Sequence, residues 1–216
     1  MEKSVYSIML MDDVVNAVDR LAYANATSRS NMINRILAEY VSMDTPEVRM
    51  QNIFSAMSGI LERQSILQPM ISASDAMLSL RSALQYKYNP SVKYVVELYP
   101  HSQTYLGELR ASLRTQNPTL LLYLGQFYHL WAKLEAAYLG GEQREYEAAD
   151  GKYTRRFLMP KNGADSGKAG EAIADYVALF DGCLKEYFDK LDAPRAAVSA
   201  VEKMYRENLS ALTAEL

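Results

Sequence analysis

The chain has 216 residues, of which 49% are hydrophobic and 23% are charged, so it can form a packed core and is not a disordered chain. This length allows one large domain, or a small module joined to a larger one. The formal net charge of −3 excludes binding to nucleic acid or to an acidic membrane through bulk charge, so any such contact must be local.

The sequence carries no pattern of export or membrane insertion. Its single cysteine, Cys183, excludes an intramolecular disulfide, and the first residues lack the basic and apolar regions of a signal peptide. The longest uncharged stretch, residues 115–132, contains polar residues such as Gln116 and His129, which predicts a buried helix and not a membrane span. We therefore expect a cytoplasmic protein with no membrane contact.

The chain opens with a period-two alternation, which predicts a short strand over residues 3–10. Its two faces carry different side chains: Tyr6, Ile8 and Leu10 on one, and Lys3, Val5, Ser7 and Met9 on the other. Asp12 and Asp13 then predict the N-cap and first turn of a helix that ends near Asn25. Ser28 predicts the N-cap of a second helix, whose apolar stripe includes Ile33, Ile36 and Leu37.

A unit of about 45 residues with one strand and two short helices cannot bury its own apolar stripes. We therefore expect it to form a homodimer, in which the strand pairs with its symmetry mate as a two-stranded antiparallel ribbon over four helices.

The rest of the chain predicts a mixed domain. Thr45-Pro46-Glu47 predicts the start of a linking helix to about residue 67, and alternation over residues 78–88, 92–98 and 105–114 predicts a three-stranded antiparallel meander. Asn117-Pro118 opens an apolar central helix to about residue 139. Residues 140–170 read as polar connections with a hairpin candidate at Asp150-Gly151 and a mobile stretch over 161–170, and two amphipathic helices follow.

Residues 3–43 resemble the ribbon-helix-helix DNA-binding family. The resemblance rests on the opening Ser-Val-Tyr-Ser-Ile-Met-Leu-Met-Asp-Asp-Val-Val, on Val-Asp-Arg-Leu-Ala at residues 18–22, and on Ser-Arg-Ser-Asn-Met-Ile-Asn-Arg-Ile-Leu at residues 28–37 with Tyr40. It covers about a fifth of the chain. In this family the paired strands enter the major groove, which admits a two-stranded ribbon.

The resemblance implies three sets of functional residues. The outward strand residues Lys3, Val5, Ser7 and Met9 would contact bases; Ser28, Arg29 and Ser30, at the start of the second helix, would contact phosphates; and Tyr6, Ile8, Leu10, Ile33, Ile36 and Leu37 would form the dimer core.

The resulting fold class is α+β and mostly α: a ribbon-helix-helix module over residues 1–44, then a helical α+β domain with the meander over residues 45–216. The predicted function is that of a sequence-specific repressor of transcription that binds double-stranded DNA as a dimer. Association of several dimers would add specificity to a short reading site. The C-terminal domain would serve oligomerisation or bind a protein or small-molecule effector.

Other functions have weaker support. The alternative is an antitoxin or other adaptor that binds a protein through its C-terminal part and uses the N-terminal module for dimerisation and autoregulation. Gly163-Ala-Asp-Ser-Gly-Lys-Ala fails as a phosphate loop in both spacing and chemistry. His101, His129 and Cys183 are too scattered for a metal site, so we predict no metal, no cofactor and no catalysis. His129 and Cys183 are instead expected in the core.

A basic face of the meander has two interpretations. The charged residues expected on its solvent side are Arg81, Lys87, Lys93, Arg110 and Arg114, against Glu97 and Glu108. Such a face is usually solvated, and its less favoured interpretation is a second basic patch for flanking DNA or an acidic partner. A small-molecule pocket between the sheet and the central helix is a further candidate, because tyrosines would line it.

Overall fold

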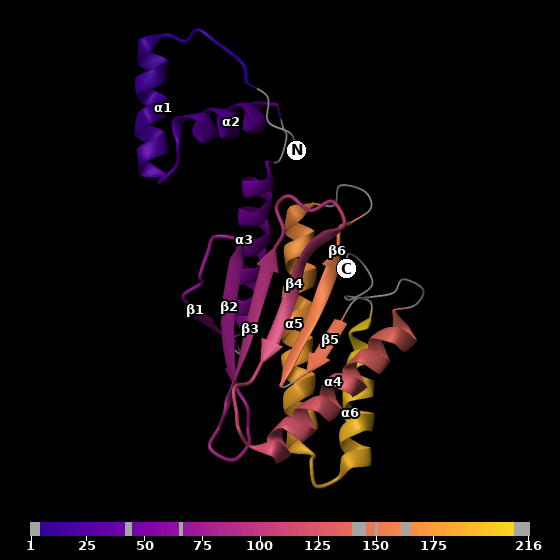
Figure 1. The fold of residues 1–216 in the computed structure, drawn as a ribbon. Coiled ribbons are helices and arrows are strands. Elements are labelled where there is room, and N and C mark those ends of the chain that lie inside the picture. Colours follow the sequence, from indigo (N-terminus) through magenta and orange to yellow (C-terminus); the bar gives the residue numbers. More distant parts are fainter. Residues whose placement is uncertain are drawn as a thin grey trace. The chain divides into compact units, whose positions relative to one another are not determined.

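The computed structural model of the chain describes residues 5–41, 45–64, 67–139, 146–149, 151–160 and 165–209. The chain divides into two compact units, Met1–Gln51 and Asn52–Leu216, which we name unit 1 and unit 2. Figure 1 shows the path of the chain through both.

Unit 1 is helical. It contains α1 (Asp12–Ala24), α2 (Arg29–Tyr40) and the first turns of α3 (Pro46–Gln64). Met11 occupies the N-cap of α1 and makes no side-chain cap, so the predicted cap is wrong, although Asp12 and Asp13 do lie in the first turn. The cap at Ser28 is confirmed, because its Oγ accepts a hydrogen bond from the Asn31 amide at 3.2 Å.

The predicted opening strand is wrong for the residues that the structure describes. Residues 5–11 form no strand, and α1 is the first regular element. Alternation specifies which side chains would share a face, but a strand also needs a neighbour for its backbone N–H and C=O groups. No backbone hydrogen bond joins residues 5–10 to any other described residue.

Unit 2 contains a six-stranded antiparallel sheet in the order β1-β2-β3-β4-β6-β5. Its strands are β1 (Gln68–Met70), β2 (Met77–Ala83), β3 (Ser91–Leu98), β4 (Tyr105–Ser112), β5 (Tyr146–Ala149) and β6 (Lys152–Leu158). The predicted meander corresponds to β2, β3 and β4, but the prediction of three strands is wrong. β2 also ends at Ala83, before the predicted end, because the following residues form the turn to β3: the Tyr86 amide donates to the Leu84 carbonyl and the Asn89 amide donates to the Tyr86 carbonyl.

The strands that were not predicted lack a clear alternation of apolar and polar residues. β1 is three exposed residues that include a proline, so it has no buried face. In β6 the inward positions are Tyr153, Arg155 and Phe157, and an arginine among them breaks the apolar alternation. The hairpin prediction is supported here, since β5 pairs with β6 across the Ala149–Lys152 register.

The remaining helices are α4 (Pro118–Tyr138), α5 (Ser166–Asp189) and α6 (Pro194–Glu207). The Asn117 side chain caps α4 by accepting from the amides of Thr119 and Leu120. The mobile stretch predicted for residues 161–170 is wrong from residue 166 onward, where α5 begins and the Asp165 carboxylate accepts from the Gly167 amide at 2.9 Å. Residues 161–164 lie outside the described residues.

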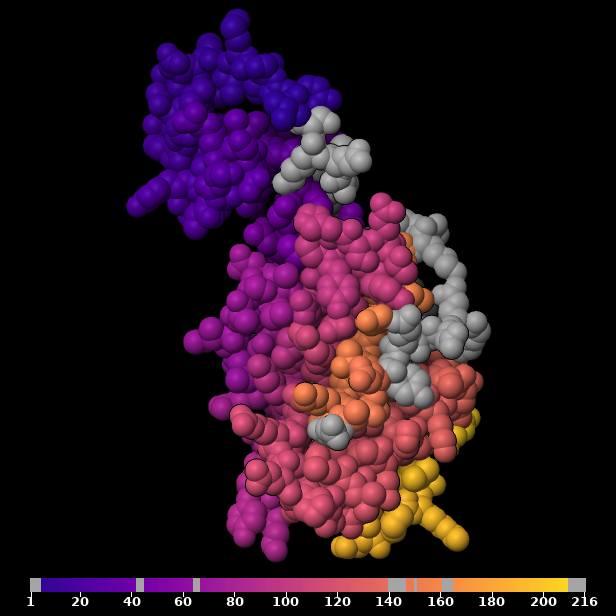
Figure 2. Space-filling view, in the orientation of Figure 1, coloured from indigo at the N-terminus to yellow at the C-terminus, as the bar shows by residue number. Residues whose placement is uncertain are grey.

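The core of unit 2 lies between the sheet and its helices, with α3 and α5 on one side of the strands (Figure 1). Aromatic rings dominate it: Trp131 of α4 and Phe180 of α5 meet at 5.0 Å between centroids. In the same orientation, atoms of the strands form much of the front surface of unit 2 (Figure 2). Among the described helices, none combines the length and apolarity that a bilayer crossing requires.

Candidate functional site

The opening segment exposes both of its faces. Val5 and Met9, predicted to contact bases, are fully exposed, and Ser7 is exposed as well. Tyr6, Ile8 and Leu10, predicted for the dimer core, are 84%, 58% and 42% exposed. Lys3 lies outside the described residues. A single chain therefore leaves the apolar side of this segment in water.

The helices of unit 1 have a very small core of their own. Val18 and Ala22 of α1 pack against Met32 of α2, with Ile33 partly buried beside them. Large apolar side chains around this core remain exposed: Val14, Leu21, Tyr23, Ile36, Leu37, Tyr40 and Val41. Of the predicted dimer-core residues on α2, Ile36 and Leu37 are thus exposed and only Ile33 is partly covered.

The start of α2 presents backbone amides that could bind an anion, and its one cationic side chain, Arg29, is already paired with a carboxylate. Ser28 caps the helix, and the next amides stand at its positive end, which favours an anion. Arg29 forms a two-pronged ion pair with Asp19 of α1, with both N–O contacts at 2.5 Å. The hydrogen bond from Arg29 lowers the pKa of the Asp19 carboxyl below its usual value. The predicted phosphate contact at Arg29 must therefore compete with Asp19, whereas Ser30 is simply exposed.

Unit 2 contains a buried charged group that the sequence analysis missed. Arg155 of β6 is 1% exposed and lies 2.8 Å from Glu135 of α4, which also accepts a hydrogen bond from Tyr153 at 2.8 Å. The guanidinium lies over the rings of Phe157 and Tyr176, at 5.0 and 4.4 Å. Burial raises the pKa of Tyr153 and Tyr176 well above the usual value. The only sequence signal was an arginine at an inward position.

A second buried carboxylate, Asp181 of α5, is fully engaged. It accepts hydrogen bonds from Ser82 at 3.1 Å and Tyr94 at 2.8 Å, and pairs with Lys185 at 2.7 Å. Both carboxylates thus tie helices to the sheet. Buried charges held by hydrogen bonds in this way are typical of structural groups.

The isolated histidines and the cysteine do not form a reactive group. His101 and His129 are exposed, so the prediction of a core position for His129 is wrong. Cys183 is buried as predicted, and burial raises the pKa of its thiol to about 12. No group of three metal-ligating side chains occurs among the residues that the structure describes.

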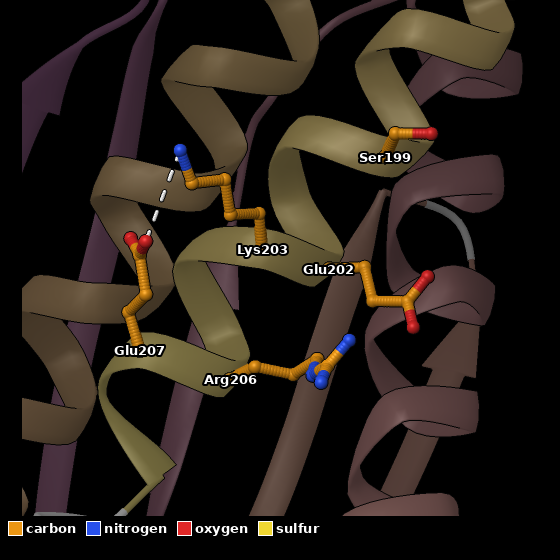
Figure 3. A pocket seen from close by; sticks show the side chains of 5 residues that line it. All are labelled: Ser199, Glu202, Lys203, Arg206 and Glu207. Carbon is orange, nitrogen blue, oxygen red and sulfur yellow. Dashed lines mark ion pairs between the residues drawn. The ribbon is translucent and has the colours of Figure 1, made fainter.

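A hollow of about 480 Å³ lies beside α6. Figure 3 shows that its charged side chains do not converge: Lys203 and Glu207 extend to one side of the helix, and Glu202 and Arg206 to the other. Lys203 and Glu207 form a long ion pair of 3.8 Å, and Glu202 accepts a hydrogen bond from Tyr138. The charged side chains of this hollow therefore do not form a cluster that could bind a charged ligand.

Comparison with family models, with curated proteins and with solved structures finds no match for the chain.

Proposed function

We propose that two copies of unit 1 associate and that the dimer binds double-stranded DNA as a repressor of transcription. The observation that carries this proposal is the apolar surface of unit 1. Among the described residues of unit 1, exposed aliphatic and aromatic side chains outnumber the three buried ones, Val18, Ala22 and Met32. A small unit with so little core gains most of its stability from association, and a second copy presents the same apolar surface.

The opening segment and the start of α2 support DNA as the ligand. Residues 5–10 have no backbone partner among the described residues, and the side chains of Val5, Ser7 and Met9 are exposed. This segment can therefore contact the base edges in a groove of DNA. The capped start of α2, with Ser28, Arg29 and Ser30, offers amides and one cation to a phosphate.

The packing of unit 2 favours a regulator over an antitoxin. An antitoxin's partner-binding part would be expected to order only on binding. Unit 2 instead has its own aromatic core, in which Phe127, Trp131 and Phe180 are each buried.

Assembly is tested by Ile36→Asp, which places a charge in the proposed shared core. We expect a wild-type dimer in analytical ultracentrifugation and a monomer for the variant, because a charge excluded from water costs several kcal/mol. Leu122→Asp on α4 is the matched control, since Leu122 is also exposed but lies in unit 2. Leu37→Asp is a second variant of the same surface, so that the result does not depend on whether Ile36→Asp alone disturbs the folding of α2. A wild-type monomer, or dimers in both unit 1 variants, would refute the proposed assembly.

DNA binding is tested by mobility shift with the DNA upstream of the protein's own gene, beside a scrambled fragment of equal length. Arg29→Ala should reduce the slope of log affinity against log salt by about two per dimer, because each copy loses one phosphate contact. Lys133→Ala in unit 2 should leave the slope unchanged. Equal binding of both fragments would argue against sequence-specific repression.

A further inference from the structure

The face of the sheet that points away from the core carries a basic row. Lys93 of β3 is opposite Ser112 of β4, which in turn is opposite Lys152 of β6. Residues in register across neighbouring strands point to the same face. The two lysines therefore stand two strand spacings apart, about 10 Å, with the Ser112 hydroxyl between them.

The row belongs to a hollow of about 500 Å³ on this face. One end is basic, and the other is apolar, with Met77 and Val95 on the strands and Ile71 on the segment after β1. Ile71 is 100% exposed, although isoleucine is normally among the most buried residue types. Ser79, Ser112 and Thr154 also line the hollow.

The charge on this row is not neutralised within the described part of the chain. Arg110, which also lines the hollow, pairs with Glu97 and Glu108. Lys93 and Lys152 form no ion pair with any described acidic residue, and both are exposed. The two free ammonium groups face one hollow, so an anion placed between them would contact both.

We propose that this hollow binds a small organic molecule with an anionic head, held by Lys93, Ser112 and Lys152, and an apolar body against Ile71, Met77 and Val95. The volume lies in the range of small-molecule sites, which combine apolar walls with a few polar groups. A DNA backbone would use a longer stripe of cations and would not need the apolar end. The site lies wholly in unit 2, and its ligand binding does not depend on DNA binding by unit 1.

The probe is phenyl phosphate, which combines a phosphate with an apolar ring, and inorganic phosphate and phenol serve as its separate halves. Affinities for the full chain are measured by ligand-observed NMR titration. We expect phenyl phosphate to bind more tightly than either half. Lys93→Ala and Lys152→Ala should each weaken it roughly tenfold, because each removes one charge-assisted contact.

Controls separate this site from other basic groups and from unit 1. Lys93→Arg should retain most of the affinity because it keeps the charge, and Lys133→Ala on α4 should have no effect. Arg29→Ala in unit 1 should also leave phenyl phosphate binding unchanged, so a failure of DNA binding is distinguishable from a failure here. Matched unfolding midpoints would show that the exposed lysine variants fold.

Three outcomes would overturn the inference. The first is equal affinity for phenyl phosphate in wild type, Lys93→Ala and Lys152→Ala. The second is binding of inorganic phosphate or phenol that is as tight as binding of phenyl phosphate. That result would show that the anionic head and the apolar body do not both contribute to affinity. The third is a loss of DNA affinity in the two lysine variants without a loss of phenyl phosphate binding, which would assign the row to DNA.

Discussion

At the scale of single residues, the ion pair between Asp19 and Arg29 limits the positive charge that the start of α2 offers to a ligand. Arg29 is the only basic residue among the three predicted phosphate contacts, and Asp19 holds two of its nitrogens. Both side chains remain substantially exposed. Water and salt therefore screen the pair, and an exposed pair of this kind contributes little to stability. A phosphate can compete for Arg29 at a small cost.

Removal of Asp19 should therefore strengthen DNA binding. For Asp19→Ala we expect roughly three- to tenfold higher affinity at low salt, because the arginine no longer exchanges one anion for another. Fluorescence anisotropy with labelled DNA measures the change.

Asp13→Ala is the matched control for Asp19→Ala. It removes the same charge from α1, where Asp13 lies in the first turn and has no described contact with Arg29. An equal gain in the two variants would show that only the net charge of unit 1 matters.

Residue-scale predictions from sequence succeeded for some of the local chemistry. The cap predicted at Ser28 and the helix start predicted at Asn117-Pro118 are confirmed, whereas the cap predicted at Asp12 and Asp13 is wrong, because Met11 stands at the N-cap. The pair between Glu135 and Arg155 could not be predicted, because it joins α4 to β6 and depends on which face of each element turns inward. The contact of Asp19 with Arg29 could not be predicted either, because the sequence of neither helix determines the angle at which the two helices pack.

At the scale of elements, α3 and α5 approach each other closely at a glycine. A Cβ built on Gly170 of α5 would lie 2.4 Å from the Ile53 carbonyl oxygen and 2.9 Å from the Ala56 Cβ on α3. Backbone atoms cannot move aside as a flexible side chain can. This contact fixes how deeply the two helices pack against each other.

Gly170→Ala should thus destabilise unit 2 by about 1–3 kcal/mol, the usual cost of overpacking a tight contact. Gly59→Ala on α3 is the matched control, because nothing lies within 4 Å of its Cβ position. It should instead stabilise the helix by up to about 1 kcal/mol. Urea unfolding followed by fluorescence of the single tryptophan, buried Trp131, measures both. Equal midpoints for the two variants would contradict the close approach.

Element-scale prediction depended on whether an element's own residues carry its pattern. β2, β3 and β4 could be predicted because their sequences alternate, and in β3 alternate side chains are indeed buried. The opening strand was wrong although its alternation is regular, because no other described strand runs beside it. The helix α5 begins within a stretch rich in glycine, where packing against α3 at Gly170 outweighs the low helix propensity of that residue type.

At the scale of the whole molecule, the two units differ in how they are stabilised. The described part of unit 1 buries three apolar residues, whereas unit 2 has a large aromatic core of its own. The stability of unit 1 should then depend on protein concentration, because association drives it by mass action. The stability of unit 2 should not depend on protein concentration.

Hydrogen exchange measured by mass spectrometry at a series of dilutions distinguishes the two. We expect peptides from α1 and α2 to lose protection on dilution, while peptides from β3, β4 and α5 keep theirs. Ile36→Asp should show the diluted pattern at every concentration. Protection of α1 and α2 that is independent of concentration would mean that unit 1 is stable alone.

Whole-molecule organisation was the least predictable level. A small N-terminal part and a larger α+β remainder followed from the change in pattern along the sequence. The order of the strands did not, because β6 lies between β4 and β5. Of the candidate site on the outer sheet face, the sequence predicted only Lys93 and Arg110 as solvent-side charges, whereas residue 152 lay in a stretch interpreted as polar connections. The hollow depends on Lys93 and Lys152, which are 59 positions apart and share a row only through β4.

The burial of Cys183 has a practical consequence. Its thiol is enclosed and stays protonated at ordinary pH, whereas the thiolate is the nucleophile that reacts with thiol reagents. Maleimide dyes and spin labels should leave the folded chain unmodified. A new cysteine on the exposed opening segment, for example through Ser7→Cys, would then take up the label alone, and distances between two such labels would report directly on how copies meet.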